Sequence, residues 1–350
     1  MINSPELLCS LNVSLNLTPP NRHRIMKFSI ILATYNRKED LLTLLKSLSL
    51  QDYDPGRIEV IIVDDGSTDG TGDAVTSFGP GMPFHVIYLN QANSGPGVAR
   101  SRGMEKATGD MFLFIDTDCT VPPGYLSTIA TEHEKSPFDA FGGPDTADIH
   151  FSAWDKAVSF TLTSFLTTGG LRGASGKKLA RYYPRSFNMG LKRRVYEEIG
   201  GFGSIFQYGE DIEYSHRILQ SGAVVRFLPD AVVYHKRRSS PAAFARQVYR
   251  MGKARIQLWR IDRSLLEPLH TLPLIATLTG LIWLLLALLL GGVAALSFII
   301  ILLIGVFAMG VIGAIQTRSV AALLLVPAAF AIQTVAYGSG MLTELLKGKK

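Results

Sequence analysis

Short apolar runs alternate with amphipathic stretches over the first part of the chain. The runs KFSIILATYN, EVIIVDDGS, FHVIYLN and DMFLFIDTD predict strands, whereas RKEDLLTLLKSLSLQ and GVARSRGMEKATG have the residue spacing and closing signals of helices. Because these strands are continuously apolar, they indicate a parallel sheet that helices cover on both faces. We therefore expect a nucleotide-binding α/β domain that binds its ligands at the carboxyl ends of the strands.

The last quarter of the chain is almost continuously apolar. Between Thr271 and Gln316 the only polar interruptions are hydroxyl groups, and a second apolar stretch covers residues 320–342. A bilayer core about 30 Å thick needs roughly 20 helical residues, so the first stretch is long enough for two spans and the second for one. These runs have no hydrophilic face, which a helix of a soluble protein would need. The sequence thus predicts an integral membrane protein, with two to three spans in residues 270–346.

Basic residues gather just before the first predicted span. The whole chain has a formal net charge of +6, and in residues 236–263 the only acidic residue among many Lys and Arg is Asp262. Such a belt marks the cytoplasmic side of a span and attracts anionic lipid headgroups. Membrane contact explains this charge more simply than nucleic acid does, so no nucleic-acid partner is expected. Apolar residues recur among the cations, and residues 239–266 are predicted to form an amphipathic helix in the membrane interface.

Two segments have no regular pattern of apolar residues. Residues 1–26 are interpreted as a loose N-terminal extension, because they contain a proline pair and lack the basic start of a signal peptide. Residues 164–186 are rich in glycine and basic side chains and are predicted to form a loop near the strand ends. The cysteines Cys9 and Cys119 exclude a disulfide framework and fit a reducing compartment.

Polar side chains follow three of the predicted strands. ATYNR follows the first strand, DDGSTD the second and DTD the fourth, so that three loops meet at one edge of the sheet. The fourth strand ends in Asp116 and Asp118, which are two residues apart and can turn toward one cation. Mg²⁺ is usually held by one or two carboxylates while substrate phosphates complete its shell. The pair therefore predicts a site for a metal diphosphate, although Asp is also common at strand ends that meet water.

Five segments, in order, resemble the motifs of glycosyltransferase family 2. They are SIILATYNR, EVIIVDDGSTDGT, NSGPGVARSRGMEKATGDMFLFIDTD, SFNMGLKRRVYEEIGGF and YGEDIEYSHRIL. The resemblance covers roughly residues 27–235 and implies a GT-A fold, in which helices flank a mixed sheet. It also implies a nucleotide-diphosphate sugar as donor and inversion at the anomeric carbon. We assign residues 27–238 to this catalytic domain.

The resemblance implies roles for the donor-binding residues. Thr34 and Tyr35 match the loop that receives the nucleotide base, and Asp65 matches the acid that contacts the edge of the base. Arg100 matches the arginine near the pyrophosphate, which fits the ability of a guanidinium to neutralise phosphate through paired hydrogen bonds. The family's usual Asn after this arginine is Ser101 here, so that contact lacks its usual residue.

The same resemblance implies a metal site. Asp116 and Asp118 match the metal motif of the family, with Asp118 as the principal ligand. His235 ends the apolar run AVVYH, where many relatives place a further metal ligand, although a histidine at a strand end can also be structural. An imidazole ligand would favour Mn²⁺ over Mg²⁺. The expected cofactor is a divalent metal, either Mg²⁺ or Mn²⁺.

The YGED segment supplies the residues expected to act on the acceptor. Asp211 matches the family's general base, which would take the proton of an attacking hydroxyl, and Glu210 would orient it or bind the acceptor. An alternative is that both acids simply favour the N-terminus of a helix, where the helix dipole attracts negative charge. Asn188 and Gly190 resemble the acceptor-side segment of the family, although a packing turn would have a similar sequence.

These features predict a membrane-anchored inverting glycosyltransferase. It would move a sugar from a nucleotide-diphosphate sugar to a hydroxyl of a lipid-borne acceptor at the cytoplasmic face of the cell membrane. One alternative acceptor is a polyprenyl phosphate, whose oxygen is already ionised at neutral pH and has little need of a general base. Another alternative is a membrane protein that binds a nucleotide sugar without catalysis and whose spans form a conduit. Three spans are few for such a conduit.

The predicted membrane topology leaves the third apolar segment open. The basic belt places the catalytic domain in the cytoplasm and Arg318 in a cytoplasmic turn between the second and third segments. Three full crossings would then put the C-terminal KGKK outside, against the usual bias of positive charge toward the cytoplasm. A re-entrant or interfacial third segment is the alternative.

Overall fold

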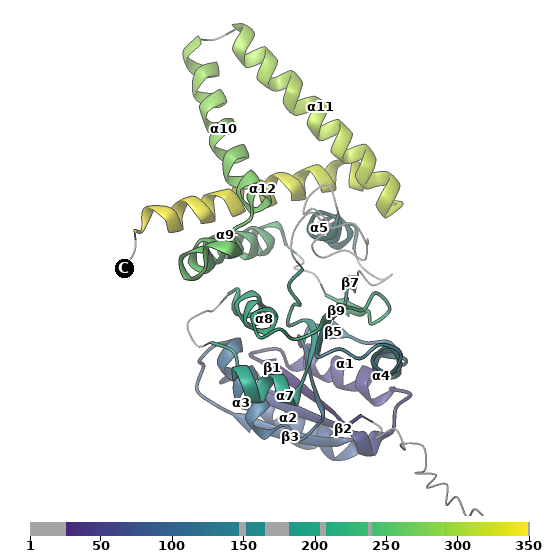
Figure 1. Cartoon of the computed structure of the whole chain (residues 1–350). Helices are drawn as coiled ribbons and strands as arrows, with labels where there is room; N and C mark the ends of the chain where they lie inside the picture. The colour runs from purple at the N-terminus through teal and green to yellow at the C-terminus, as the bar shows by residue number, and fades with distance from the viewer. Residues whose placement is uncertain are drawn as a thin grey trace, which may run out of the picture.

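The chain folds into an α/β domain that carries a group of long helices on one side (Figure 1). The computed structural model describes residues 26–146, 152–164, 182–203, 208–236, 240–290 and 292–348. The predicted N-terminal extension up to residue 25, most of the predicted loop 164–186 and the last two residues lie outside these ranges. Arg237 and Arg238 of the basic belt also lie outside them.

Seven strands within the described ranges form the central mixed sheet, in the order β3-β2-β1-β4-β8-β6-β9. The parallel part contains β1 (Phe28–Thr34), β2 (Ile58–Asp64), β3 (His85–Asn90) and β4 (Met111–Ile115). β8 (Asn188–Lys192) runs antiparallel to β4 and to β6 (Ala140–Gly142), while β9 (Val225–Phe227) is parallel to β6. All residues of β2 and β4 are buried, which confirms the prediction of a sheet covered on both faces.

Helices cover both faces of this sheet. Neighbouring strand residues point to opposite faces, so they pack against different helices. Ile30 of β1 packs with α1 (Lys38–Ser49), α2 (Thr71–Phe78) and α4 (Tyr125–Lys135). Ile31, the next residue, packs with α3 (Pro96–Lys106), α7 (Arg193–Ile199) and α8 (Glu210–Gln220) on the other face. Short 3₁₀ turns occur at Pro55–Arg57, Gly79–Gly81 and Arg263–Leu265.

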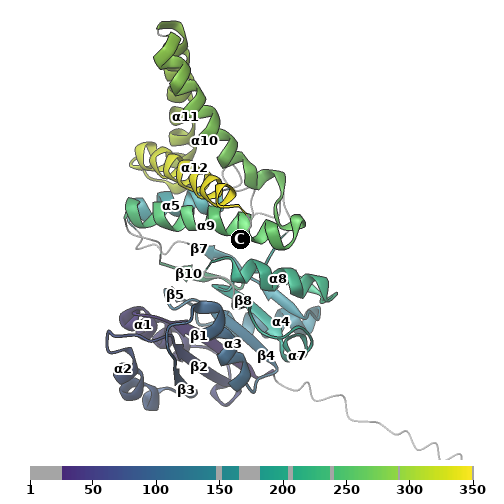
Figure 2. The ribbon, with the colours of Figure 1, turned by 90° about the vertical axis from the view of Figure 1, so that its left-hand side faces the viewer.

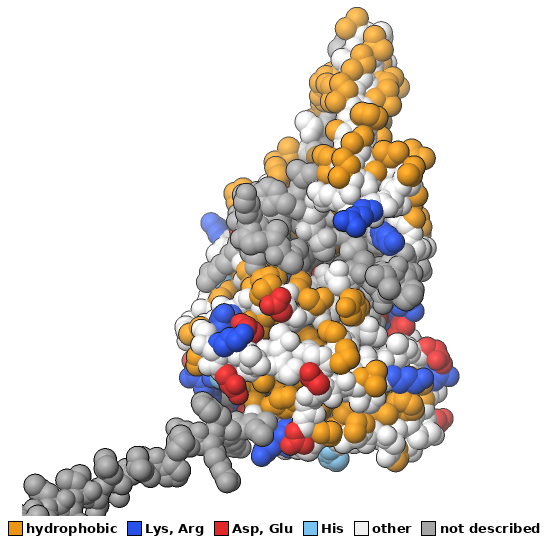
Figure 3. Space-filling model, turned by 90° about the vertical axis from the view of Figure 1, so that its right-hand side faces the viewer, with side chains coloured by type: hydrophobic (Ala, Val, Ile, Leu, Met, Phe, Trp, Pro, Cys, Tyr) orange, Lys and Arg blue, Asp and Glu red, His pale blue; other side chains and the backbone are white. Residues whose placement is uncertain are grey.

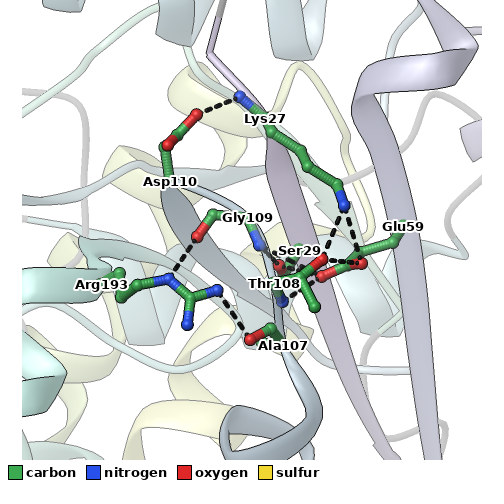
Figure 4. A network of polar contacts seen from close by, with 8 residues as sticks. All are labelled: Lys27, Ser29, Glu59, Ala107, Thr108, Gly109, Asp110 and Arg193. Atoms are coloured by element: carbon green, nitrogen blue, oxygen red, sulfur yellow. Dashed lines mark hydrogen bonds and ion pairs between the residues drawn. The ribbon is translucent and has the colours of Figure 1, made fainter.

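A hydrogen-bonded cluster fixes the end of the sheet that lies opposite the expected ligand edge (Figure 4). Glu59 of β2 accepts hydrogen bonds from the Ser29 hydroxyl at 2.5 Å and from the Thr108 hydroxyl at 2.5 Å, and it pairs with Lys27 at 3.2 Å. Burial acts to raise the pKa of Glu59, but these hydrogen bonds outweigh burial and lower the pKa to about 2. The cluster therefore ties β1, β2 and the start of β4 together through an ionised carboxylate.

A second, smaller sheet lies beside the carboxyl end of β4. Within the described part of the chain it contains β5 (Cys119–Thr120), β10 (Val233–His235) and β7 (Asp145–Thr146), in that order. Cys119 is paired with His235, and Val233 is paired with Asp145. β5, β7 and β10, which are far apart in the sequence, thus meet beside the Asp116 and Asp118 pair.

The apolar C-terminal segments form long helices. Three of the described helices are long and apolar enough to cross a membrane: α10 (Pro268–Leu290), α11 (Gly292–Thr317) and α12 (Ala322–Leu346). α10 and α11 form a hairpin that projects from the rest of the molecule and is covered with hydrophobic side chains (Figures 1 and 3). α12 instead lies across the base of the hairpin, next to α9 (Pro241–Ile261), in both views of the ribbon (Figures 1 and 2).

The predicted amphipathic helix is present as α9, but protein covers much of its apolar side. Phe244 and Val248 pack against α12 and against α5 (Ala153–Thr163). The backbones of α9 and α12 touch at glycines: a Cβ atom added to Gly252 or to Gly340 would lie 2.1 Å from a carbonyl oxygen of the other helix. The periodicity of residues 239–266 thus indicated a helix with an apolar face but did not indicate which surface covers that face.

Candidate functional site

A cavity of about 560 Å³ lies where the carboxyl ends of β1 and β4 face α9. Its lining includes most of the site residues expected from the sequence, namely Tyr35, Arg100, Asp116, Asp118, Glu210, Asp211 and His235. Thr34, Asp65, Asn188 and Gly190 do not belong to the lining. On the opposite wall α9 contributes several residues, α5 contributes Val158 and Leu162, and α12 contributes Tyr337. The cavity therefore joins the strand ends to the helices that carry the apolar hairpin.

A candidate metal site lies at the strand-end side of the cavity. The Nε2 atom of His235 is 3.1 Å from Oδ1 of Asp118, and a ligand atom of Cys119 lies within 4.8 Å of both. The small sheet causes this juxtaposition, because β10 places His235 beside Cys119 of β5. Imidazole, carboxylate and thiolate groups together favour a transition metal over Mg²⁺. The sequence predicted Asp118 and His235 here but not the nearby thiol.

Asp145 contacts His235, the histidine of the candidate metal site. Its side chain is fully buried, and its Oδ2 atom lies 3.3 Å from Nδ1 of His235, on the side of the ring that faces away from Asp118. A histidine that binds a metal usually donates its other ring N–H to a carboxylate or carbonyl, which fixes the tautomer and the ring orientation. The Asp145 contact therefore holds His235 in the orientation that presents Nε2 to the cavity.

Arg100 links the two acidic parts of the cavity. Its guanidinium donates to Oδ1 of Asp116 at 2.7 Å and to Oε1 of Glu210 at 2.9 Å, and the residue is only 5% exposed. Asp116 follows β4 and Glu210 begins α8, so this buried pairing sets the distance between the strand end and the α8 segment. The predicted contact of Arg100 with a pyrophosphate stays a prediction.

Glu210 and Asp211 occupy the first turn of α8, as the dipole argument also expects. Burial and the neighbouring Asp211 raise the pKa of Glu210 to about 7, although Arg100 acts in the opposite direction. Asp211 accepts a hydrogen bond from the Ile212 N–H at 2.9 Å and lies 3.5 Å from the Arg185 guanidinium. Asp211 therefore lines the cavity with a cation beside it, and its role as general base stays a prediction.

The predicted base-binding residues lie at the side of the cavity. Tyr35 is 49% exposed, whereas Thr34 is buried. Asp65 accepts hydrogen bonds from Gln91 Nε2, Ser94 N–H and Gly95 N–H, each at 2.8 Å. In this structure Asp65 therefore holds residues 91–95 in place, and its contact with a base stays a prediction.

The structure does not support direct acceptor contact by Asn188 and Gly190. Asn188 is fully buried, and its amide group donates to the carbonyl oxygens of Pro144 and Ala231 and accepts from the Tyr125 hydroxyl. A Cβ atom on Gly190 would lie 2.2 Å from the Phe141 ring. Both residues thus serve the packing of β8, which is the alternative that the sequence had left open.

Comparisons with known proteins agree with this geometry. The family model described as Glycosyl transferase family 2 matches residues 29–200. The uncharacterized glycosyltransferase YwdF of Bacillus subtilis is 30% identical over 221 residues, which are 60% of this chain and 74% of that protein. The glycosyltransferase AglE of Haloferax volcanii is 25% identical over 246 residues, which are 70% of this chain and 78% of that protein.

A solved structure shows the same fold over most of the chain. It is the mannosyltransferase PcManGT from Pyrobaculum calidifontis, solved in complex with GDP-Man and Mn²⁺. The alignment has a TM-score of 0.67 with 20% sequence identity, and it covers 93% of this chain and 88% of the other. The fold therefore extends beyond the α/β domain into the helical part.

Proposed function

Because the chain belongs to glycosyltransferase family 2 and has its GT-A fold, we propose that it transfers a sugar from a nucleotide-diphosphate sugar to a hydroxyl of a lipid-borne acceptor. The transfer would invert the anomeric carbon and take place at the cytoplasmic face of the cell membrane. The observation that carries the proposal is the cavity, which has the Asp118 and His235 group on one wall and α9, α5 and α12 on the other.

The residues around Asp118 fit a divalent cation. Asp118 and His235 offer ligand atoms 3.1 Å apart, Cys119 lies within reach, and Asp145 orients the imidazole. PcManGT was solved with Mn²⁺ and a nucleotide sugar, and the ligand types here suit the same metal. When bound, such a cation would neutralise the diphosphate and make it a better leaving group.

The protein's own groups supply the acceptor chemistry. In the proposed reaction the acceptor oxygen forms a bond to the anomeric carbon while the bond from that carbon to the diphosphate oxygen breaks. Asp211 takes the hydroxyl proton as the new bond forms, and the diphosphate leaves with the bonding electrons. Glu210 and Arg100 position Asp211 relative to Asp116, because their buried pairing joins the two loops.

The position of α12 supports an interfacial rather than a crossing third segment. Glu344 near its C-terminal end is buried against α9, where it accepts from Gln257 at 3.0 Å and pairs with Arg260 at 3.4 Å and Lys253 at 3.8 Å. If the cationic helix α9 lies at the depth of the lipid headgroups, α12 lies at the same depth along its length. We infer that α10 and α11 cross the membrane, and that the catalytic domain and the C-terminus share the cytoplasmic side.

A binding and transfer assay tests the proposed function. Purified protein in lipid nanodiscs would be screened with a panel of nucleotide sugars by thermal shift, and the stabilising sugars would be supplied in radiolabelled form with membrane lipid extract. We expect label to enter the organic phase with Mn²⁺ present and not with excess EDTA. Persistent binding of a nucleotide sugar without turnover on any lipid extract would instead favour a non-catalytic binding protein.

A further inference from the structure

One face of α9 presents arginines to the cavity. The residues of α9 that line it recur at the three- and four-residue spacing of a single helix face: Ala243, Arg246, Gln247, Arg250, Met251, Ala254 and Arg255. Of the three arginines, Arg255 donates to the carbonyl oxygen of Leu265 at 2.9 Å. Arg246 and Arg250 are four residues apart, so their side chains are neighbours on this face. α9 lies between the α/β domain and α12 (Figures 1 and 2).

The lining of the cavity has an excess of positive charge. Its described lining contains seven Arg and Lys residues and four Asp and Glu residues. At the strand ends, cations and acids are matched: Arg100 pairs with Asp116, and Arg37 lies 3.8 Å from Asp118. On α9, by contrast, Arg246 has no acidic partner in the part of the chain that the structure describes, and Arg250 donates to the uncharged Tyr208 hydroxyl. Among the described residues, these two guanidinium groups therefore have no carboxylate partner.

Arg250 is also tied to the acceptor-side segment. Its guanidinium lies 5.2 Å from the centre of the Tyr208 ring, and Tyr208 comes three residues before Asp211. Arg185 lies 3.5 Å from Asp211. Arg185, Arg246 and Arg250 line the same cavity as the proposed base. An anion bound there would be adjacent to the attacking group of the acceptor.

Apolar side chains also line the cavity. Val158 and Leu162 of α5, Met251 of α9 and Tyr337 of α12 belong to its lining. α5 and α12 pack together with the hairpin helix α11. The lining thus combines acids of the α/β domain, cations of α9 and apolar side chains of α5, α9 and α12, which are the groups that a lipid with an anionic headgroup requires.

We propose that the acceptor is a phosphate-bearing lipid, and that Arg246 and Arg250, together with Arg185, bind its phosphate. Planar guanidinium groups bind phosphate through paired, charge-assisted hydrogen bonds, and an uncharged lipid would leave these cations without a counter-ion. This inference rests on the proposed function and specifies the acceptor class. The phosphate links the lipid to a sugar whose hydroxyl attacks. A terminal phosphate whose own oxygen attacks would keep this phosphate site but overturn the hydroxyl acceptor of the proposed function.

A binding experiment tests the phosphate site without transfer. Purified protein in dodecyl maltoside would be titrated with farnesyl phosphate and with farnesol, and binding would be followed by the melting temperature. We expect farnesyl phosphate, but not farnesol, to stabilise the wild type. The double variant Arg246→Gln with Arg250→Gln should bind farnesyl phosphate roughly 100-fold more weakly, since each arginine contributes charge-assisted hydrogen bonds.

The matched control is Arg263→Gln, which removes a cation of the same belt that does not line the cavity. It should bind farnesyl phosphate like the wild type. Equal stabilisation by farnesol, or unchanged binding of farnesyl phosphate by the double variant, overturns the proposal.

A transfer experiment separates the acceptor class from the function. Membrane lipids would be divided into neutral and phosphate-bearing fractions by anion exchange and offered with the labelled donor. We expect product only from the phosphate-bearing fraction, and mild acid then tells the two phosphate sources apart, because glycosyl phosphates are labile and glycosides mostly survive. Product from neutral lipids overturns the acceptor class and leaves the transferase function intact. No product from any fraction, with farnesyl phosphate binding retained, contradicts the proposed function and leaves the phosphate site supported.

Discussion

Asp145→Asn tests whether the small sheet is built around a metal. Asn keeps the size of Asp145 but removes the charge that faces Nδ1 of His235 at 3.3 Å, in a position where the side chain is fully buried. A hydrogen bond to a charged group is worth about 1.5–3 kcal/mol. Loss of such a partner behind a histidine ligand typically weakens metal binding by roughly 10–100-fold. We expect the Mn²⁺ affinity of Asp145→Asn to fall within that range.

The assay measures the metal directly rather than the reaction. Mn²⁺ would be titrated into the protein in nanodiscs, and the free ion would be followed by its electron paramagnetic resonance signal. Asp139→Asn is the matched control, because Asp139 is also a buried acid of the α/β domain but pairs with Arg194 and accepts from the Val224 N–H, outside the cavity. That variant should lose stability and keep its Mn²⁺ affinity. A folded Asp145→Asn protein with wild-type affinity, or an equal loss in both variants, would refute the reasoning.

Three further predictions follow from other parts of the structure. Asp118→Asn should lower turnover by about 100-fold or more with the fold intact, since it removes a charged metal ligand, and normal activity in excess EDTA would argue against the site. Glu59→Gln should destabilise the fold by about 2 kcal/mol at pH 7, because the folded-state pKa of Glu59 is lowered to about 2. Thermal unfolding should show that the stability difference between wild type and variant shrinks as the pH falls below 4.5 toward 2. A stability difference that stays constant with pH would contradict this prediction. In a Cys9→Ser background, an impermeant thiol reagent applied to intact cells should label a cysteine at Gly292 but not one at Gly348, whereas labelling at Gly348 would indicate three crossings.

The parts of the fold that local pattern determines were predicted from the sequence. The continuous apolar runs of β2 and β4 give strands that are buried on both faces, and the leucine spacing of residues 38–49 gives α1. The apolar stretches give α10, α11 and α12, and the interfacial alternative for the third segment stays a prediction. Each of these patterns is formed by residues that are close to one another in the sequence.

The missing parts depend on contacts between distant segments. β7 contains two residues, and no apolar run predicts its pairing with β10. The sequence therefore did not indicate that Asp145 lies beside His235. Arg100 and Glu210 are 110 residues apart, so the sequence did not indicate this buried pair, and the contact of Arg100 with a pyrophosphate stays a prediction. Helical spacing alone would place Arg246 and Arg250 on one face of α9, but only the fold shows that this face lines the cavity.

The most direct test of the central claim compares Asp211→Asn with Glu213→Gln on the labelled donor and the lipid acceptor. Glu213 lies in the same turn of α8 but pairs with Arg217 at 2.6 Å and does not line the cavity. If Asp211 removes the proton of an acceptor hydroxyl, Asp211→Asn should lower kcat by about 10²–10⁴-fold with an unchanged KM for the donor, and Glu213→Gln should stay near the wild type. The wild-type product should have the inverted anomeric configuration and survive mild acid. An acid-labile product made by Asp211→Asn at a near-normal rate would contradict the account.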